Sequence, residues 1–324
     1  MKAIVCKEFG PPEKLVFEDF ELPALKPNEV RIAVKAAGVN FPDTLIIENR
    51  YQFKGTPPFV PGAEAAGKVI ECGEKIRHLR PGDMVAALLT TGAFAEEAIT
   101  SGENVLPIPQ TMSPVDAAVF PLMYGTTLYA LKQRGQLKPG ETLLVLGAAG
   151  GVGLAAVQIG KLMGARVIAA ASSDEKLAVC AAHGADELVN YADTGLKDAV
   201  KQLTGGAGAD VIYDPVGGPL AQDCLSCINW SGRYLVIGFA AGSIPEIAAN
   251  RLLLKGASAV GVFWGAFVSR EPQASFDNFQ QLFEWYAEDR LKPMVSKTYP
   301  LAEAAQALRD MLGRKVTGKL ALTT

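Results

Sequence analysis

The sequence predicts an α/β protein with a β-rich N-terminal domain and a second domain built around a doubly wound parallel sheet. The chain has 324 residues, which at roughly 150 residues per domain suggests two domains. Its first 120 residues are punctuated by glycine and proline, as in chains of short strands. After Pro121, apolar runs alternate with helical patterns, as in a parallel sheet with helical crossovers.

The N-terminal region has the pattern of short, half-buried strands. Residues 30–34 alternate apolar and polar side chains, which is the period of a strand with one buried face. Turn signals recur at 10–12 (GPP), 57–58 (PP), 61–62 (PG) and 81–83 (PGD). Short strands at this spacing predict a barrel or a sandwich with long loops.

The next region alternates strands and helices. We expect strands at 143–146, 167–171, 187–189, 210–213 and 234–237, and helices near 151–163, 174–182, 195–203 and 219–228. Alternation of this period predicts a parallel sheet with both faces covered. Because crossovers between parallel strands are right-handed almost without exception, the natural result is a doubly wound sheet.

The C-terminal region changes pattern again. Residues 276–289 predict an amphipathic helix, 302–312 an alanine-rich helix, and 319–322 a closing strand. Periodicity alone leaves two arrangements open, because this tail could extend the parallel sheet or return to the first domain.

The charge balance argues against a primary role on nucleic acid. Lys and Arg total 31 against 34 Asp and Glu, which gives a net charge of −3. Proteins that bind DNA or RNA usually show a basic excess or a clustered basic stripe, and neither is visible here. We therefore expect a small-molecule partner and no nucleic acid.

Neither a signal peptide nor a membrane span is expected. The N-terminus is a short alternating strand with a lysine already at position 7, so it lacks the apolar core of a signal peptide. The longest uncharged stretch, 142–160, contains five glycines and is predicted to be strand, turn and helix. The five cysteines are scattered and odd in number, as in a reduced, cytoplasmic protein.

A glycine turn is the sharpest local feature. An apolar strand ends at Leu146 and is followed by GAAGGVG at 147–153, where a helix begins. Glycines permit a tight turn and let a pyrophosphate approach the backbone, and the helix N-terminus favours an anion. This strand, turn and helix context predicts a dinucleotide site.

The end of the following strand indicates which nicotinamide cofactor is bound. An NAD site usually has Asp or Glu there to accept the ribose hydroxyls. This chain has Ser172 and Ser173 at that point and Lys176 one helical turn later, which suits a 2′-phosphate and favours NADPH. Two alternatives stay open: Ser172 and Glu175 fit a capping box, and Asp174 lies close enough for NAD.

Four motifs together resemble a known family. They are PGAEAAG at 61–67, GTTL at 125–128, AAGGVG at 148–153 and GRYLV at 232–236. In this order they resemble the zinc-independent quinone oxidoreductase (zeta-crystallin-like) branch of the medium-chain dehydrogenase/reductase superfamily, over the whole chain.

The resemblance implies an inserted nucleotide-binding domain. Residues 1–124 would form the first part of a GroES-like catalytic domain, 125–257 a Rossmann domain that binds NADPH, and 258–324 a return to the catalytic domain. Members of this branch are commonly homodimers joined through the sheets of the nucleotide domains. The apolar run 257–267 is a candidate for the edge strand of such a dimer.

The resemblance also implies specific contacts to the cofactor. The pyrophosphate would lie on Gly150, Gly151, Val152 and Gly153. The adenosine 2′-phosphate would be held by Ser172, Lys176, Tyr191 and Arg314. The nicotinamide end would be touched by Asn40, Thr127, Gly238, Phe239, Phe263 and Gly265.

We expect no metal. Zinc-dependent cousins need Cys or His after the glycine-valine step and a His before the glutamate of the second motif. This chain has Asn40 and Ala63 at those positions, and neither residue supplies a tetrahedral zinc ligand. Cys224 and Cys227 form a lone pair in a predicted helix and are expected to be buried and inert.

Without a metal to polarise a carbonyl, the expected acceptors are quinones and alkenes conjugated to a carbonyl. The predicted catalytic groups are Asn40, Thr127 and Tyr51, with Tyr51 at a position where related enoyl reductases place a proton-donating tyrosine. Asp43 and Glu64 are expected to hold loop geometry. Many quinone-reducing relatives have a tyrosine where this chain has Leu45.

Three functions stay open at this point. The leading one is an NADPH:quinone reductase, and the second is an NADPH-dependent reductase of activated C=C bonds in 2-enoyl thioesters, enones or acrylate-type acids. The third is a low-turnover protein that binds NADPH in a structural or redox-sensing role.

Overall fold

The computed structural model describes residues 1–313 and 316–324. The chain divides into two compact units. Unit 1 comprises Met1–Leu122 and Pro293–Thr324, and unit 2 comprises Met123–Lys292. The second boundary was expected at 257/258 and lies at 292/293 instead. The difference arises because residues 258–292 contribute the last strand of the parallel sheet and two helices to unit 2.

Unit 1 is built mainly from antiparallel strands. A seven-stranded sheet has the order β14-β15-β3-β4-β5-β7, with β6 also paired to β3, and β1 and β2 form a separate pair. The strands are β1 (Lys2–Val5), β2 (Val16–Asp19), β3 (Glu29–Val39), β4 (Glu64–Cys72), β5 (Met84–Leu88), β6 (Glu97–Ser101), β7 (Val105–Pro107), β14 (Val295–Pro300) and β15 (Lys319–Thr323). The β-rich prediction for this region is confirmed.

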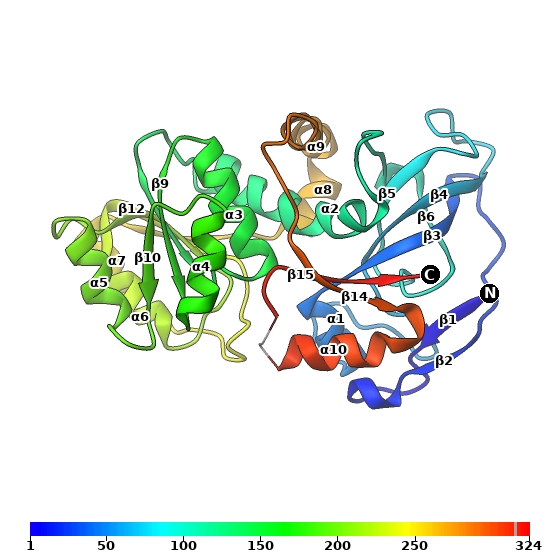
Figure 1. Ribbon diagram of the computed structural model, residues 1–324, viewed down its shortest axis with the longest axis horizontal. Coiled ribbons are helices and arrows are strands. Elements are labelled where there is room, and N and C mark those ends of the chain that lie inside the picture. Colours follow the sequence, from blue (N-terminus) through cyan, green and yellow to red (C-terminus); the bar gives the residue numbers. More distant parts are fainter. Residues whose placement is uncertain (314–315) are drawn as a thin grey trace. The chain divides into compact units, whose positions relative to one another are not determined.

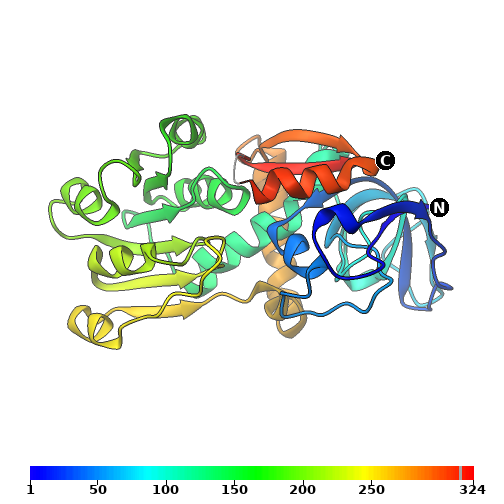
Figure 2. The ribbon, with the colours of Figure 1, turned by 90° about the horizontal axis from the view of Figure 1, so that it is seen from below.

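The C-terminal segment completes unit 1. Strands β14 and β15 pair in parallel, and β15 adds antiparallel to β3. Helix α10 (Ala304–Leu312) packs beside these strands (Figures 1 and 2). Helix α1 (Phe41–Ile47) follows β3 directly and contacts α10. The tail therefore returns to the N-terminal domain, which was one of the two arrangements left open by its periodicity.

Unit 2 contains a six-stranded parallel sheet in the order β10-β9-β8-β11-β12-β13. Its strands are β8 (Thr142–Leu146), β9 (Arg166–Ala171), β10 (Glu187–Asn190), β11 (Ala209–Asp214), β12 (Ile228–Val236) and β13 (Ser258–Gly261). In sequence order this arrangement is 3-2-1-4-5-6, the strand order of dinucleotide-binding folds. The predicted doubly wound sheet is confirmed.

Helices cover both faces of this sheet. Strand side chains alternate, so Leu143 and Leu144 point to opposite faces. Leu143 packs at Gly160 of α3, whereas Leu144 lies in one cluster with Leu225 of α6. The helices of unit 2 are α3 (Gly151–Leu162), α4 (Asp174–Ala182), α5 (Leu196–Leu203), α6 (Leu220–Ser226), α7 (Ala249–Lys255), α8 (Trp264–Arg270) and α9 (Pro272–Ala287).

Helix α2 (Pro114–Leu128) begins in unit 1 and ends in unit 2, and its π-helical continuation η3 spans Tyr129–Arg134. Across residues 1–313 and 316–324, no helix combines the length and the apolar character that crossing a bilayer requires.

Candidate functional site

The glycine turn links β8 to α3 as the sequence predicts. Gly147 has φ +54°, a left-handed conformation that favours glycine. Gly150 N donates to Gly147 O at 2.9 Å and closes the turn, and Leu154 N donates to Gly150 O at 2.8 Å. The first backbone N–H groups of α3 have no partner within the helix, because no turn precedes them. They present donors and the positive end of the helix dipole to an anion.

Gly153 holds the turn tightly against the start of α3. A Cβ atom at this position would lie 2.3 Å from Gly147 O and 2.8 Å from Ala148 Cα, both backbone atoms. Because no side chain fits at residue 153, the backbone of the turn can lie close against the start of α3. A pyrophosphate fits this cradle, because the contacts it needs come from backbone N–H groups and not from side chains.

Three other predicted cofactor residues of unit 2 lie at the same edge of the sheet. Ser172, Tyr191 and Gly238 follow the carboxyl ends of β9, β10 and β12. The strand order reverses between β8 and β11, which makes this edge a topological switch point. Ligands of open parallel sheets bind at such points.

Ser172 and Lys176 lie together at the end of β9. Lys176 Nζ donates to Ser172 Oγ at 3.3 Å; the Ser172 side chain is exposed and the Lys176 side chain is half-buried. The capping interpretation of Ser172 is wrong, because Ser173 is the residue that caps α4, accepting from Lys176 N at 3.5 Å. Asp174, which left NAD open, accepts from Asn190 Nδ2 at 2.9 Å. A hydroxyl and an ammonium therefore face solvent where a 2′-phosphate is expected.

Thr127 is fully buried and its hydroxyl is engaged within unit 2. Its Oγ1 donates to Met123 O at 2.9 Å and lies 2.9 Å from the hydroxyl oxygen of Tyr213. Burial raises the pKa of Tyr213, so this hydroxyl pair stays protonated. The other predicted nicotinamide contacts vary in exposure. Phe263 is 66% exposed at the start of α8, which contains Gly265.

Asp214 is a functional candidate that sequence reasoning missed. It ends β11, and its Oδ1 accepts from Val216 N at 2.7 Å and Gly217 N at 2.8 Å. Its Oδ2 accepts from the Tyr234 hydroxyl, and its carbonyl accepts from Gly238 N at 3.4 Å. The buried side chain of Asp214 thus fixes the loop after β11, and its backbone carbonyl holds the start of the segment with Gly238 and Phe239. The signal in the sequence was an acidic residue at a strand end just before a Pro-Val-Gly-Gly turn.

In unit 1, Asn40 lies in a buried polar cluster with Glu64 and Lys319. Asn40 Nδ2 donates to Glu64 Oε1 at 2.9 Å, and Lys319 Nζ donates to Glu64 Oε1 at 2.9 Å and also to Asn40 Oδ1. Glu64 Oε2 accepts from Leu122 N at 3.0 Å. The three side chains are at most 5% exposed. The sequence analysis named Asn40 and Glu64 but missed Lys319.

Asp43 belongs to the same cluster. Its Oδ2 accepts from Asn40 N at 2.8 Å and fixes the start of α1. Its Oδ1 is buried and has no hydrogen-bond partner in the described part of the chain. Burial raises the pKa of Asp43 to about 7, against the opposing effects of the Asn40 N–H and Lys319, with Glu64 adding to the rise. Both carboxylates hold loop geometry, as expected, but Asp43 also titrates near neutral pH.

This titration predicts a pH-dependent effect of Asp43→Asn. Between about pH 4 and 7 the folded chain keeps a proton that the unfolded chain releases, so the stability that Asp43 contributes is present below about pH 4 and is lost as the pH rises to about 7. The variant lacks this loss. Urea denaturation measures the free energy of unfolding of the variant and of the parent at about pH 5 and about pH 8. The difference, variant minus parent, should be larger at the higher pH, by up to about 1.4 kcal/mol per unit of pKa shift.

Asp19→Asn is the control for this prediction. Asp19 is exposed, and the Lys2 ammonium lowers the pKa of its carboxyl, so its titration lies below this window. Its difference from the parent should stay constant over the same pH range. A constant difference for Asp43→Asn as well would contradict the assignment.

Tyr51 lies in the loop after α1 and is partly buried against the core of unit 1. Burial raises the pKa of its hydroxyl, and the nearby Asp43 carboxylate adds to the rise. The hydroxyl therefore keeps its proton at neutral pH and can act as a donor. Leu45, on α1, is likewise partly exposed.

Zinc does not fit the residues of unit 1. Within residues 1–313 and 316–324, no three His, Cys, Asp or Glu side chains come together as a metal site. Glu64, the carboxylate that contacts the Asn40 side chain, already has the Lys319 ammonium at 2.9 Å. A lysine cation against that oxygen disfavours a second cation there.

The cysteine pair is a buried feature of unit 2. Cys224 and Cys227 are free thiols with no exposed surface, at the C-terminal end of α6. Burial raises the pKa of Cys227 to about 12 and that of Cys224 well above its usual value. A thiolate is the reactive form, so both groups are unreactive at neutral pH.

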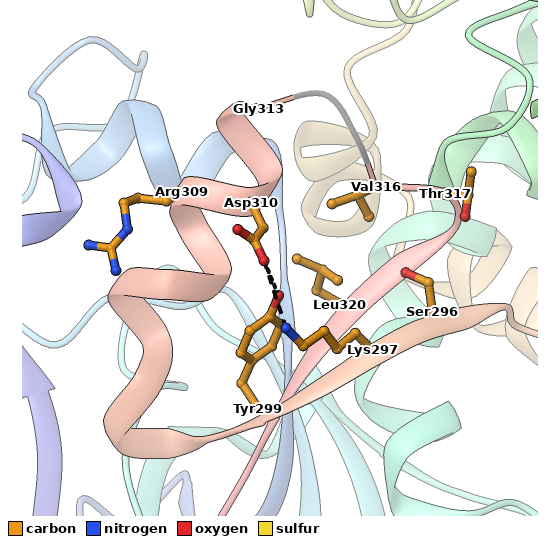
Figure 3. Close-up of a pocket in the computed structure, with 9 residues that line it drawn as sticks. All are labelled: Ser296, Lys297, Tyr299, Arg309, Asp310, Gly313, Val316, Thr317 and Leu320. Atoms are coloured by element: carbon orange, nitrogen blue, oxygen red, sulfur yellow. Dashed lines mark hydrogen bonds and ion pairs between the residues drawn. The ribbon is translucent and has the colours of Figure 1, made fainter. Parts of the chain in front are cut away.

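A pocket of about 450 Å³ lies on unit 1, and sequence reasoning did not anticipate it (Figure 3). Its centre holds the Tyr299 hydroxyl, which donates to Asp310, with Lys297 Nζ 4.2 Å from the Tyr299 ring centroid. None of the predicted site residues is among those described as lining it. Arg314, predicted to hold the 2′-phosphate, lies outside the described residues.

Comparisons with known proteins match both domains. The alcohol dehydrogenase GroES-like domain matches residues 26–110, and the zinc-binding dehydrogenase family matches residues 151–288. A quinone oxidoreductase-like protein 2 homolog of Nematostella vectensis is 40% identical over 100% of this chain and 89% of its own length. The quinone oxidoreductase of Sus scrofa is 33% identical, over 99% of this chain and 97% of its own.

Solved structures agree with these matches. Escherichia coli quinone oxidoreductase, in complex with NADPH, is 28% identical with a TM-score of 0.93 and full coverage of both chains. The CurK enoyl reductase is also 28% identical, with a TM-score of 0.89, and the match covers 99% of this chain and 98% of that one. The chain therefore belongs to the medium-chain dehydrogenase/reductase superfamily, among the members named quinone oxidoreductases, and is an oxidoreductase with a domain for a nicotinamide dinucleotide.

Proposed function

We propose that this protein is a zinc-independent, NADPH-dependent reductase that transfers hydride to a quinone. The observation that carries the proposal is the combination of the glycine turn before α3 with the Ser172–Lys176 contact after β9. Bound NADPH supplies the hydride from its nicotinamide ring. The chain's own residues bind and orient the cofactor, exclude water and supply a proton to the reduced acceptor.

The preference for NADPH rests on charge. A 2′-phosphate needs charge-assisted donors to compete with water, and Lys176 supplies one beside the Ser172 hydroxyl. Asp174, the residue that would accept from the ribose hydroxyls of NAD, is bonded to Asn190. Tyr191 follows the neighbouring strand β10, and Arg314 remains part of the proposal.

Lys176→Ala is expected to weaken NADPH binding much more than NADH binding. A hydrogen bond to a charged group contributes about 1.5–3 kcal/mol, so the Kd for NADPH should rise about tenfold or more. Fluorescence titration with both cofactors measures the ratio. Lys197→Ala, an exposed lysine of α5, is the control and should leave both affinities unchanged. Equal weakening of both cofactors by Lys176→Ala would show that this lysine does not meet the 2′-phosphate.

The choice of acceptor follows from the absence of zinc ligands at Asn40 and Ala63. Charge that develops on an acceptor oxygen must be stabilised by hydrogen-bond donors or delocalised into the acceptor. Quinones delocalise that charge and take up hydride readily. Tyr51, with its protonated hydroxyl, is the proposed donor, and Asn40 and Thr127 are proposed to line the nicotinamide end.

An acceptor screen tests this proposal. The absorbance of NADPH is followed with 1,4-benzoquinone and 9,10-phenanthrenequinone and, in parallel, with enones and 2-enoyl thioesters. We expect rapid oxidation with the quinones. NADPH that is bound tightly but oxidised by no acceptor would favour the third function, a structural or redox-sensing role.

Reduction of activated C=C bonds is the second candidate. It is favoured by Tyr51 and by Leu45, which makes the region around α1 more apolar than a tyrosine would. The similarity to the CurK enoyl reductase supports the same class. Faster turnover with enones than with quinones in the screen would select this function.

We further propose a cytoplasmic homodimer. Strand β13 is the last strand on its side of the parallel sheet in the described chain, and edge strands present unpaired backbone groups. Nearby on α7, Leu253 and Leu254 are 80% and 73% exposed, which favours coverage by a second copy. Light scattering on the purified protein measures its mass. The five free cysteines support a reducing compartment.

A further inference from the structure

Lys319 is a buried lysine whose position is set by strand pairing. Strand β15 runs antiparallel to β3 with Leu320 opposite Val39, which brings Lys319 next to Asn40. On the other side of β3, Ala65 of β4 lies opposite Ala37, which brings Glu64 next to Gly38. Lys319 is therefore level with Asn40, which follows the end of β3, and Glu64 is level with Gly38, two residues earlier on the same side of the chain. The pairing of the three strands brings a cation, an amide and a carboxylate together.

Each charge in this cluster, the Lys319 ammonium and the Glu64 carboxylate, has a partner. Lysine is almost never fully buried unless it is paired, and Lys319 is 5% exposed. Its ammonium donates to Glu64 Oε1 at 2.9 Å and to Asn40 Oδ1. Glu64 accepts from three donors, Lys319, Asn40 Nδ2 and Leu122 N. A Cβ at Gly38 would lie 2.5 Å from Glu64 Oε1, so a side chain at residue 38 would displace the carboxylate.

The pair dictates the orientation of the Asn40 amide. The amide oxygen faces the ammonium, and the amide NH₂ faces the carboxylate. The flipped amide would set NH₂ against NH₃⁺ and oxygen against a carboxylate oxygen, so it is electrostatically disfavoured. The Asn40 backbone is held as well, because its N–H donates to Asp43 Oδ2 at 2.8 Å.

Stability alone does not account for this arrangement. Burying two charges costs desolvation energy, and apolar residues of similar volume are often as stabilising or more so. Unlike an apolar pair, the ion pair fixes the orientation of each hydrogen-bonding group that contacts it. The group so fixed is Asn40, the side chain of unit 1 that the proposed function places at the nicotinamide end.

We propose that Lys319 is a positioning residue for the hydride-transfer step, acting by locking the Asn40 amide in one orientation through its pairing with Glu64. The role rests on the proposed function. Lys319 itself touches neither the cofactor nor the acceptor. Its removal lowers the rate of hydride transfer while leaving cofactor binding, which is assigned to unit 2, nearly unchanged.

The test uses Lys319→Met and the double variant Lys319→Met/Glu64→Gln. The single variant leaves Glu64 buried without its cation, and the double variant removes both charges. We expect the free energy of unfolding to recover toward the parent in the double variant. We expect the single-turnover rate of NADPH oxidation to stay about tenfold or more below the parent in both. The Kd for NADPH should change by less than about threefold, and Lys68→Met, an exposed lysine on β4, should change nothing.

A double variant that is stable and transfers hydride at the parent rate would overturn the proposal, because Lys319 would then be purely structural. Should both variants fail to fold, the parent protein supplies the test. The Asn40 side-chain NH₂, assigned by its loss in Asn40→Asp, should give two distinct NMR signals protected from exchange with water. Rapid exchange would contradict a locked amide. If none of the tested acceptors supports NADPH oxidation by the parent protein, the proposed function is rejected. The NMR measurement still shows in that case whether the Asn40 amide is held in one orientation.

Discussion

Tyr51→Phe is expected to lower kcat for enone reduction by at least about tenfold, since a positioned acid commonly contributes about 10²–10⁴-fold. The substitution removes only the hydroxyl oxygen, and the ring keeps its packing against the core of unit 1. The pKa of Tyr51 is raised by burial and by Asp43, so the parent hydroxyl holds its proton for donation. Steady-state assays with NADPH and an enone measure the loss, with quinone reduction followed alongside.

Tyr129→Phe is the matched control. Tyr129 stacks on Phe267 with ring centroids 4.1 Å apart in unit 2, and it is outside the predicted site. Its variant should keep the parent rate, and both variants should bind NADPH as the parent does. An unchanged rate for Tyr51→Phe removes this tyrosine from the mechanism and weakens the enone reductase alternative.

Glu64→Leu is expected to cost about 3–5 kcal/mol of the free energy of unfolding, the range measured when one partner of a buried ion pair is removed. Three donors lose their acceptor at once: Lys319 Nζ, Asn40 Nδ2 and Leu122 N. The remaining ammonium is 5% exposed and has no second carboxylate within salt-bridge distance in the described chain. Urea denaturation measures the change.

Glu71→Leu tests whether the effect belongs to the buried pair. Glu71 lies on the same strand, β4, and its half-exposed side chain pairs with Arg31 at 3.5 Å. Exposed pairs contribute about 0–1 kcal/mol, so this variant should lose little. Equal costs at residues 64 and 71 would contradict the account of the cluster.

The parallel sheet could be predicted from sequence because its signals are local. An apolar run bounded by glycine, followed by a capped amphipathic segment, identifies both a strand and the next helix. The predicted helix 174–182 has the bounds of α4, Asp174–Ala182. The strand predicted at 234–237 was too short at its start. Strand β12 begins at Ile228 and contains Ser231 with φ +57° and Gly232, which break the apolar pattern.

The position of the domain boundary could not be predicted from periodicity, which identifies helices and strands but not the sheet on which they pack. The helical pattern from residue 276 identified a helix, observed as Pro272–Ala287, but a pattern of 3.6 residues does not say which sheet the helix packs on. The return to unit 1 begins at Pro293, where β14 and β15 add to β3. That pairing depends on partners far apart in the chain.

The cluster of unit 1 shows the same limit for the candidate site. Asn40 and Glu64 stood in motifs, so the sequence analysis weighed them, but Lys319 is 255 residues from Glu64. Only the register of three strands brings these residues together. In unit 2 the glycine turn and the Ser172–Lys176 pair each lie within a few residues of the chain, so the sequence could name them as candidates. Asp214 was missed because its role is to hold backbone N–H groups of its own loop.

Calorimetric titration of the metal-stripped protein with NADPH and with NADH tests whether unit 2 binds a phosphorylated dinucleotide and whether the protein works without zinc. We predict one site per chain, with NADPH bound at least about tenfold more tightly than NADH, and rapid oxidation of the bound NADPH when 1,4-benzoquinone is added to the same sample. Binding of neither cofactor, or quinone reduction that returns only when zinc is restored, would contradict it.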